Sequence, residues 1–402
     1  VHTVPCRIQK PPLANHPIHV GRILPKRCER VVGPRHVEAR PNRSLRAVAA
    51  LMVLSSHLFW DIVPMRTHPA RLWIGAVGPS GVDIFFVISG FIIYHVTRRS
   101  AAKAAIEGRG RAFYTFAMKR FIRIYPLYWI VFGVAAAMTI WLPPESGFMK
   151  KPQLELLFLV NSITNYRVQA AWTLTFEVYF YAVAALGMLL FPRRVHAGLL
   201  GWFGTIAIVS IVTTVFGLDI PLDYVVAPIL LEFLLGMGVG MLIERGECRF
   251  RSVALGLGVA GLLMGSIPLH ADGGRAALSY LLRLACWGFP AALVVYGTAA
   301  FEFGKSRVMP APLQYLGDAS FSIYLWHEVV FIGVAAVFER LGWTGSVGRS
   351  VLALGMGLVG LGVGLLSYHV LERPLLRGLG RRFLGRPVAS HSLGPTIALP
   401  GR

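Results

Sequence analysis

Two ionisable side chains lie in one apolar stretch near the start of the sequence, SLRAVAALMVLSSHLFW. Arg46 and His57 are eleven positions apart in this stretch. In an α-helix that spacing is three turns plus about 20°, so both side chains share one face, about 16 Å apart along the axis. With Arg46 at the membrane edge, His57 lies near mid-membrane, where an imidazole is a candidate catalytic base. The alternative is a structural histidine bonded to a neighbouring helix.

A carboxylate inside another apolar run is the second candidate. Glu177 in AAWTLTFEVYFYAV lies about 10 Å below the outer end of its run, a depth that allows it to share a cavity with His57. A carboxylate beside an imidazole fixes its tautomer and suits a base that takes a hydroxyl proton. A structural hydrogen bond between helices is again the alternative. Glu232, His327 and Glu328 lie at comparable depths and are rivals for this role.

A pair of arginines precedes the third apolar run, in KRFIRIYPLYW. Arg120 and Arg123 are three positions apart, so they lie on the same helical face at the membrane edge. Two guanidinium groups in that arrangement can bind phosphates in forked geometry. A topogenic or lipid-headgroup cluster is an equally good explanation of the spacing alone.

Long apolar runs must position these residues. Of the 402 residues, 55% are hydrophobic and only 15% charged, against about 25% charged in a soluble domain. Runs of about 17 to 25 residues can cross a ~30 Å hydrocarbon layer as helices. The sequence therefore predicts an all-α polytopic bundle of about ten crossings. The runs cover 46–63, 80–97, 125–142, 170–191, 197–217, 225–243, 253–269, 277–300, 315–338 and 350–371.

The net charge of +21 is concentrated in three segments, 1–46, 98–123 and 373–402. Basic residues beside membrane crossings mark the cytoplasmic side. This distribution predicts that both termini are cytoplasmic, and it argues against nucleic acid as a partner. We expect a disordered basic arm over 1–42, a transmembrane domain over 43–376 and a basic cytoplasmic tail over 377–402.

Other familiar sites have no support in the sequence. The cysteines Cys6, Cys28, Cys248 and Cys286 are scattered and form no CxxC, so we expect no disulfide framework and no metal site. GxSxG, HExxH and Walker patterns are absent from the sequence. A GxxxG pattern, made by Gly236 and Gly240, predicts close helix packing.

Six segments, in this order and spacing, resemble the acyltransferase 3 family of integral-membrane O-acyltransferases. They are LRAVAALMVLSSH, GVDIFFVISGFII, RFIRIYPLYW, AWTLTFEVYFY, ASFSIYLWH and YHVLERP, and the resemblance covers about residues 44 to 376. It is strongest to the exopolysaccharide acetyltransferase branch. Members of the family move an acyl group, commonly acetyl from acetyl-CoA, onto sugar hydroxyls of cell-envelope or exported glycans.

The resemblance assigns roles to particular residues. His57 matches the family's histidine and is the expected catalytic base, with Arg46 as its paired arginine. Arg120 and Arg123 match the pair implicated in handling the acyl donor, and Glu177 falls in the WTL…E segment. The further candidates are Asp83, Ser89, Glu232 and His327.

The expected function is that of a multi-pass enzyme of the bacterial inner membrane that transfers an acyl group, as acetyl, from acyl-CoA to a polysaccharide. Acyl-CoA is expected as a substrate, with no permanently bound cofactor and no metal. The expected partners are a sugar acceptor, membrane lipid and polysaccharide export machinery. Acylation of a small molecule or lipid-linked sugar is an alternative. A proton-coupled transporter or flippase is an alternative of another class, since it too places histidines and carboxylates at mid-depth.

Overall fold

The computed structural model of the protein describes residues 42–58, 74–141, 157–159, 168–218, 227–271, 281–303, 310–342 and 346–385. Every regular element in these ranges is a helix. The arm predicted over 1–42 lies outside the described residues except for Asn42, and so do Cys6 and Cys28. Cys248 and Cys286 are free thiols.

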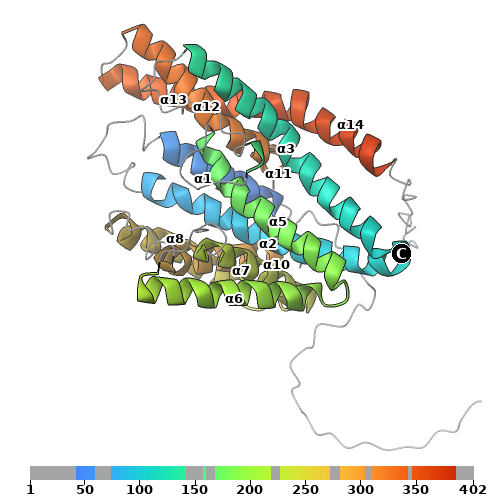
Figure 1. Ribbon diagram of the computed structural model, residues 1–402. Coiled ribbons are helices and arrows are strands. Elements are labelled where there is room, and N and C mark those ends of the chain that lie inside the picture. The colour runs from blue at the N-terminus through green and yellow to red at the C-terminus, as the bar shows by residue number, and fades with distance from the viewer. Residues whose placement is uncertain are drawn as a thin grey trace, which may run out of the picture. The chain divides into compact units, whose positions relative to one another are not determined.

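The helices follow one another as Figure 1 shows. They are α1 (Arg43–His57), α2 (Gly81–Glu107), α3 (Arg109–Trp141), α5 (Trp172–Leu190), α6 (Val195–Phe216), α7 (Leu231–Glu244), α8 (Arg251–Ala271), α10 (Phe289–Phe303), α11 (Ala311–Asp318), α12 (Ser320–Arg340), α13 (Ser346–Ser367) and α14 (Arg373–Leu384). Short 3₁₀ turns are η3 (Gly78–Ser80), η4 (Gln169–Ala171) and η5 (Pro228–Leu230). Two π-helical segments are η6 (Leu284–Gly288) and η7 (Tyr368–Glu372).

Most of the apolar runs form helices with the length and hydropathy of membrane spans. Within the described residues, seven helices are long and apolar enough to cross a bilayer. All ten predicted runs overlap a helix, but the described part of α1 is only 15 residues long and α7 only 14. A helix of 15 residues rises about 22 Å, less than the hydrocarbon thickness. The multi-pass all-α class is therefore confirmed, while the count of ten crossings and the cytoplasmic termini stay predictions.

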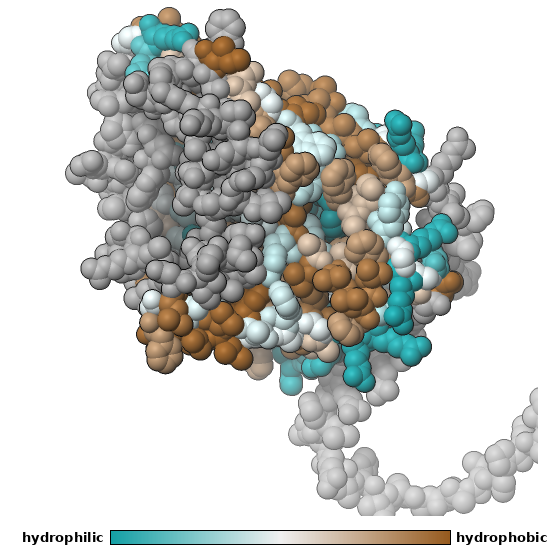
Figure 2. Space-filling model, in the orientation of Figure 1, coloured by the Kyte–Doolittle hydropathy of each residue, from teal (hydrophilic) through white to brown (hydrophobic). Residues whose placement is uncertain are grey.

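The surface agrees with this assignment. Figure 2 shows hydrophobic side chains over much of the face that it draws, with hydrophilic ones gathered at the right of the view. Figure 1 places the junction of α2 and α3 there. The junction itself is Gly108, whose φ of 90° lies in the region that glycine adopts without steric cost. The helix α14 continues to Leu384, so the boundary predicted at residue 376 falls inside a helix.

Close packing of α2 on α7 confirms the reading of the GxxxG pattern. A Cβ added at Gly236 would lie 2.0 Å from the backbone oxygen of Val87, and one at Gly240 would lie 2.8 Å from the Tyr94 ring. Gly90 of α2 meets the backbone of Phe233 in the same way, at 2.0 Å. The two backbones touch, so only glycine fits at these positions. This contact fixes α2, which supplies one wall of the site described below.

We expect Gly236→Ala to destabilise the protein by about 1–3 kcal/mol, because the new methyl group must push two helix backbones apart. The measurement is thermal unfolding of the detergent-solubilised protein. Gly238→Ala is the matched control, since nothing lies within 4 Å of a Cβ at that position. Equal melting temperatures for the two variants would contradict the packing argument.

Candidate functional site

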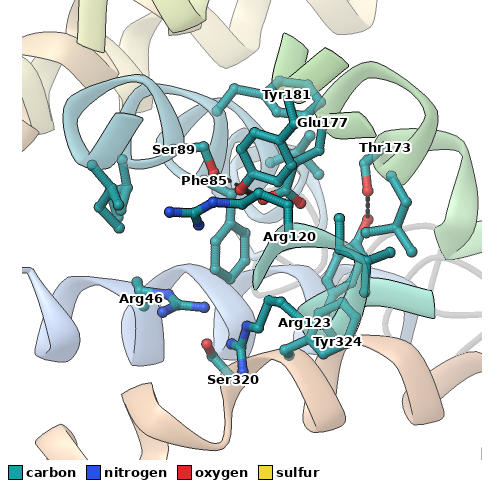
Figure 3. A pocket seen from close by; sticks show the side chains of 17 residues that line it. Arg46, Phe85, Ser89, Arg120, Arg123, Thr173, Glu177, Tyr181, Ser320 and Tyr324 are labelled. Atoms are coloured by element: carbon teal, nitrogen blue, oxygen red, sulfur yellow. Dashed lines mark hydrogen bonds between the residues drawn. The ribbon is translucent and has the colours of Figure 1, made fainter. Parts of the chain in front are cut away.

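A cavity of about 90 Å³ lies among α1, α2, α3, α5 and α12 (Figure 3). We call it the arginine cavity. It brings together five residues that the sequence singled out, from four different helices: Arg46, Ser89, Arg120, Arg123 and Glu177. Its other polar lining residues are Thr173, Tyr181, Ser320 and Tyr324.

Three guanidinium groups reach this cavity, as Figure 3 shows. The Arg120 guanidinium lies 5.0 Å from the centre of the Tyr181 ring, and its Nε is buried with no hydrogen-bond partner among the described residues. Arg123 forms an ion pair with Glu372. Arg46 lies within electrostatic range of Arg123 and of two carboxylates, Glu177 and Glu372. Three cations against two carboxylates leave one positive charge, which suits an anionic ligand.

Glu372 is a residue of the site that the sequence did not single out. It is buried, binds Arg123 and accepts a hydrogen bond of 2.6 Å from the Ser322 hydroxyl. It is the last residue of η7, and π-helical segments inside longer helices are frequent at functional sites. The available signal was an acidic residue at the end of an apolar run, in the YHVLERP segment.

Glu177 belongs to the arginine cavity rather than to the surroundings of His57. Its Oε1 accepts a hydrogen bond from the Tyr181 hydroxyl, and the Ser89 hydroxyl lies 3.4 Å from the same atom. The expected contact between Glu177 and His57 is not formed in this structure. The carboxylate of Glu177 instead offsets the positive charge of the arginines around it.

The carboxylate that does contact His57 is Glu328, from α12. The His57 Nδ1 lies 3.5 Å from Glu328 Oε1, and the other carboxylate oxygen accepts the Ala170 backbone N–H at 2.5 Å. The Glu328 side chain is 9% exposed and that of His57 31%. A held carboxylate at Nδ1 favours a proton on that nitrogen, so the imidazole Nε2 keeps its lone pair. This is the arrangement that a histidine base requires.

His327 packs beside this pair, with its ring centre 5.1 Å from that of His57. It is fully buried, and its Nδ1 lies 2.5 Å from the Tyr324 carbonyl oxygen. A carbonyl only accepts, so Nδ1 is the donor and Nε2 holds a lone pair. That Nε2 is buried with no hydrogen-bond partner among the described residues. The rival candidate thus lies next to the first candidate rather than in a separate site.

His57, His327 and Glu328 also have the side-chain types that bind a divalent metal. One ligand atom from each lies within 4.8 Å of the others. Ligands of a tetrahedral zinc ion are separated by about 3.3 Å, given bonds of about 2.0–2.1 Å. The three side chains would have to move together to bind an ion, whereas the present separations suit hydrogen-bonding and ring contacts.

Tyr324 separates this histidine pair from the arginine cavity. It lines the cavity, and its ring centre is 5.7 Å from that of His327. The Tyr324 hydroxyl lies 2.9 Å from the Thr173 hydroxyl and 3.1 Å from the Ala170 carbonyl oxygen. His57 is not among the described residues that line the cavity. Tyr324 is therefore a buried side chain that contacts both the arginine cavity and the histidine pair.

The two other sequence candidates lie elsewhere. Asp83 is fully buried and accepts two hydrogen bonds, of 2.9 and 2.8 Å, from Arg283. Glu232 is fully buried beside Asp83. Neither carboxylate oxygen of Glu232 has a hydrogen-bond partner among the described residues. Neither residue lines the arginine cavity, and the ion pair explains Asp83 as a link between α2 and the helical segment that carries Arg283.

Comparison with known protein families gives one match that covers most of the chain. Residues 43–369 match the family Acyl_transf_3, described as an acyltransferase domain. This range contains the arginine cavity and the histidine pair. No solved structure matches the chain.

Three curated proteins are similar over most of their length. The exopolysaccharide production protein ExoZ of Rhizobium meliloti is 32% identical, over 76% of this chain and 92% of its own. The acyltransferase MdmB of Streptomyces mycarofaciens is 28% identical, over 89% of this chain and 96% of its own. BcsY of Komagataeibacter xylinus is 26% identical, over 79% of this chain and 80% of its own.

Proposed function

Because the chain belongs to the acyltransferase 3 family and is an acyl-transferring membrane enzyme, we propose that it moves an acetyl group from acetyl-CoA to hydroxyl groups of an exported polysaccharide. One observation carries the proposal. Tyr324 lines the cavity together with Arg46, Arg120 and Arg123, and its ring packs on His327, which packs in turn on His57. The name of ExoZ, a protein of exopolysaccharide production, supports a polysaccharide acceptor.

The arginine cavity is the proposed donor site. An acyl-CoA carries its negative charge at the nucleotide end and its thioester at the end of a long, thin arm. The positive lining attracts the anion, and the cavity is narrow enough to hold the arm between apolar walls such as Phe85 and Phe86. The basic segment 98–123 leads into α3, which agrees with a donor that enters from the cytoplasm.

His57 is the proposed general base. Its Nε2 takes the proton of a sugar hydroxyl as the hydroxyl oxygen attacks the thioester carbonyl carbon. The C–O bond forms, the C–S bond breaks, and the proton passes from the imidazolium to the departing thiolate. Glu328 holds the ring and stabilises the imidazolium during the step. A covalent acyl-histidine intermediate is the second route.

Tyr324 must move for the thioester to meet the histidine. Its ring packs against His327, and its hydroxyl bonds Thr173 and the carbonyl of Ala170. Hydrogen bonds of this kind contribute about 0.5–1.5 kcal/mol each to stability. We propose that rotation of this buried side chain opens the cavity during turnover.

We expect Tyr324→Ala to raise hydrolysis of acetyl-CoA in the absence of acceptor several-fold and to lower transfer, because water then reaches the donor from the histidine side. Tyr324→Phe keeps the ring and removes only the hydroxyl, so it should leave the background hydrolysis low. The measurement is release of free CoA by the purified enzyme, with and without polysaccharide. Equal hydrolysis by the two variants would show that the ring is not the barrier.

The proposed function is tested with purified protein reconstituted in vesicles. Acetyl-CoA with a labelled acetyl group and the polysaccharide of the host are supplied, and NMR of the recovered glycan reports O-acetyl groups. We expect label in O-acetyl esters and stoichiometric release of CoA. Solute flux across the vesicle without consumption of acetyl-CoA would overturn the proposal in favour of a transporter. Deletion of the gene should remove the same O-acetyl signals from the secreted polysaccharide of the bacterium.

A further inference from the structure

A second cavity lies between the end of α2 and the first half of α3, and we propose that it binds the phosphate groups of the nucleotide end of the acyl donor. The inference rests on the proposed function and deepens it, because it places the part of the donor that does not react. The side chains proposed to contact phosphate are Arg99, Lys119 and Arg120.

The two cavities share a wall. The second cavity has a volume of about 290 Å³, and Arg120 lines both it and the arginine cavity. Phe116, which lies 5.5 Å from the Arg120 guanidinium, also lines the second cavity. A ligand held at Arg99 and Lys119 therefore lies next to Arg120, which also lines the arginine cavity.

The charge of the second cavity suits a polyanion. Three cations line it against one carboxylate, Glu107, and that carboxylate lies 3.7 Å from Arg111 outside the lining. Both Arg99 and Lys119 are exposed, so they are accessible to a ligand from solution. The buried Nε of Arg120, a residue that lines both cavities, has no hydrogen-bond partner among the described residues.

Arg99 differs in its contacts from Arg98, the arginine next to it in the sequence. Arg98, one residue earlier on α2, is already paired with Glu244 of α7. No ion pair of Arg99 occurs among the described residues, and its side chain lines the cavity instead. Ser100 adds a hydroxyl to the same lining, and forked guanidinium groups with nearby hydroxyls are typical phosphate contacts.

The dimensions agree with a donor stretched between the two cavities. Arg99 and Phe85 lie on the same helix, 14 residues apart, which is about 21 Å along the axis. Phe85 lines the inner part of the arginine cavity, beside Tyr324 at 5.8 Å between ring centres. The nucleotide at one end and the thioester at the other are separated by the pantetheine arm, which spans such a distance when extended.

The test compares donors with and without the nucleotide. Arg99→Ala with Lys119→Ala should raise the KM for acetyl-CoA about tenfold or more and leave kcat within about twofold. The kinetics with acetyl-pantetheine, which lacks the nucleotide, should not change. The control is Arg377→Ala with Arg381→Ala, which removes the same charge from exposed positions of α14. All variants are assayed in discs of neutral lipid.

Direct binding separates failure of this inference from failure of the proposed function. Wild-type protein should bind adenosine 3′,5′-bisphosphate, and the double variant should bind it about tenfold more weakly or worse, whether or not acetyl transfer occurs. Equal binding by both proteins, or an equal rise in KM for both donors, would overturn the inference. So would a loss of binding that appears only with anionic lipid present, because the cavity would then hold lipid phosphate instead.

Discussion

Replacing His57 with alanine is expected to lower kcat for acetyl transfer by about 10²- to 10⁴-fold, the contribution of a general base. The physical reason is the arrangement of the ring. His57 is the partly exposed member of the histidine pair, and Glu328 lies 3.5 Å from its Nδ1, which favours a proton on Nδ1 and a lone pair on Nε2. The measurement is transfer of labelled acetyl by purified protein at saturating donor and acceptor.

Two further variants show whether the effect is specific. His196→Ala removes a half-buried histidine that bonds Thr97 on the far side of α2 from α1, and it should leave kcat within a few-fold of wild type. Glu328→Gln should lower kcat less than His57→Ala does, and it should shift the pH profile of kcat, since Glu328 acts by positioning the ring. Transfer at wild-type rate by His57→Ala would remove this residue from the mechanism.

Replacing Arg123 with alanine should have two separate effects. The KM for acetyl-CoA is expected to rise about 10- to 100-fold, since hydrogen bonds to charged groups are worth about 1.5–3 kcal/mol. The protein should also lose about 3–5 kcal/mol of stability, because the buried carboxylate of Glu372 then keeps, among the described residues, only its bond with Ser322. Donor kinetics and thermal unfolding measure the two effects independently.

A double variant separates the two roles. Glu372→Gln added to Arg123→Ala removes the unpaired buried charge and keeps an acceptor for the Ser322 hydroxyl. We expect the melting temperature to recover while the KM stays high. Recovery of both quantities would mean that Arg123 only neutralises Glu372, and the donor role assigned to it would be wrong.

The spacing of residues along a single helix predicts which arginines lie together at the cavity. Arg120 and Arg123 share a face because they are three apart, and both line the arginine cavity. Arg46 lines it as well, as expected from its place at the start of the first apolar run. Their proposed roles in donor binding remain predictions until the variants are measured.

The depth of a residue along its helix did not identify the partner of His57. Depth along a helix puts Glu177, Glu328 and His57 at comparable levels, and Glu177 is the partner predicted for His57. Depth gives the height of a side chain but not the direction in which it points, and that direction depends on the rotation of each helix against its neighbours. In the structure Glu177 faces the arginines and Glu328 faces His57.

The sequence by itself determined the membrane class, the all-α architecture, the family resemblance and the small set of ionisable residues worth examining. Each of these follows from composition or from a spacing of a few residues, which one helix is enough to express. The tertiary structure decided which residues meet: Arg123 with Glu372, His57 with Glu328, and Tyr324 between the two groups. These contacts join residues more than two hundred positions apart or side chains on different helices, and only the packing of helices against one another fixes them.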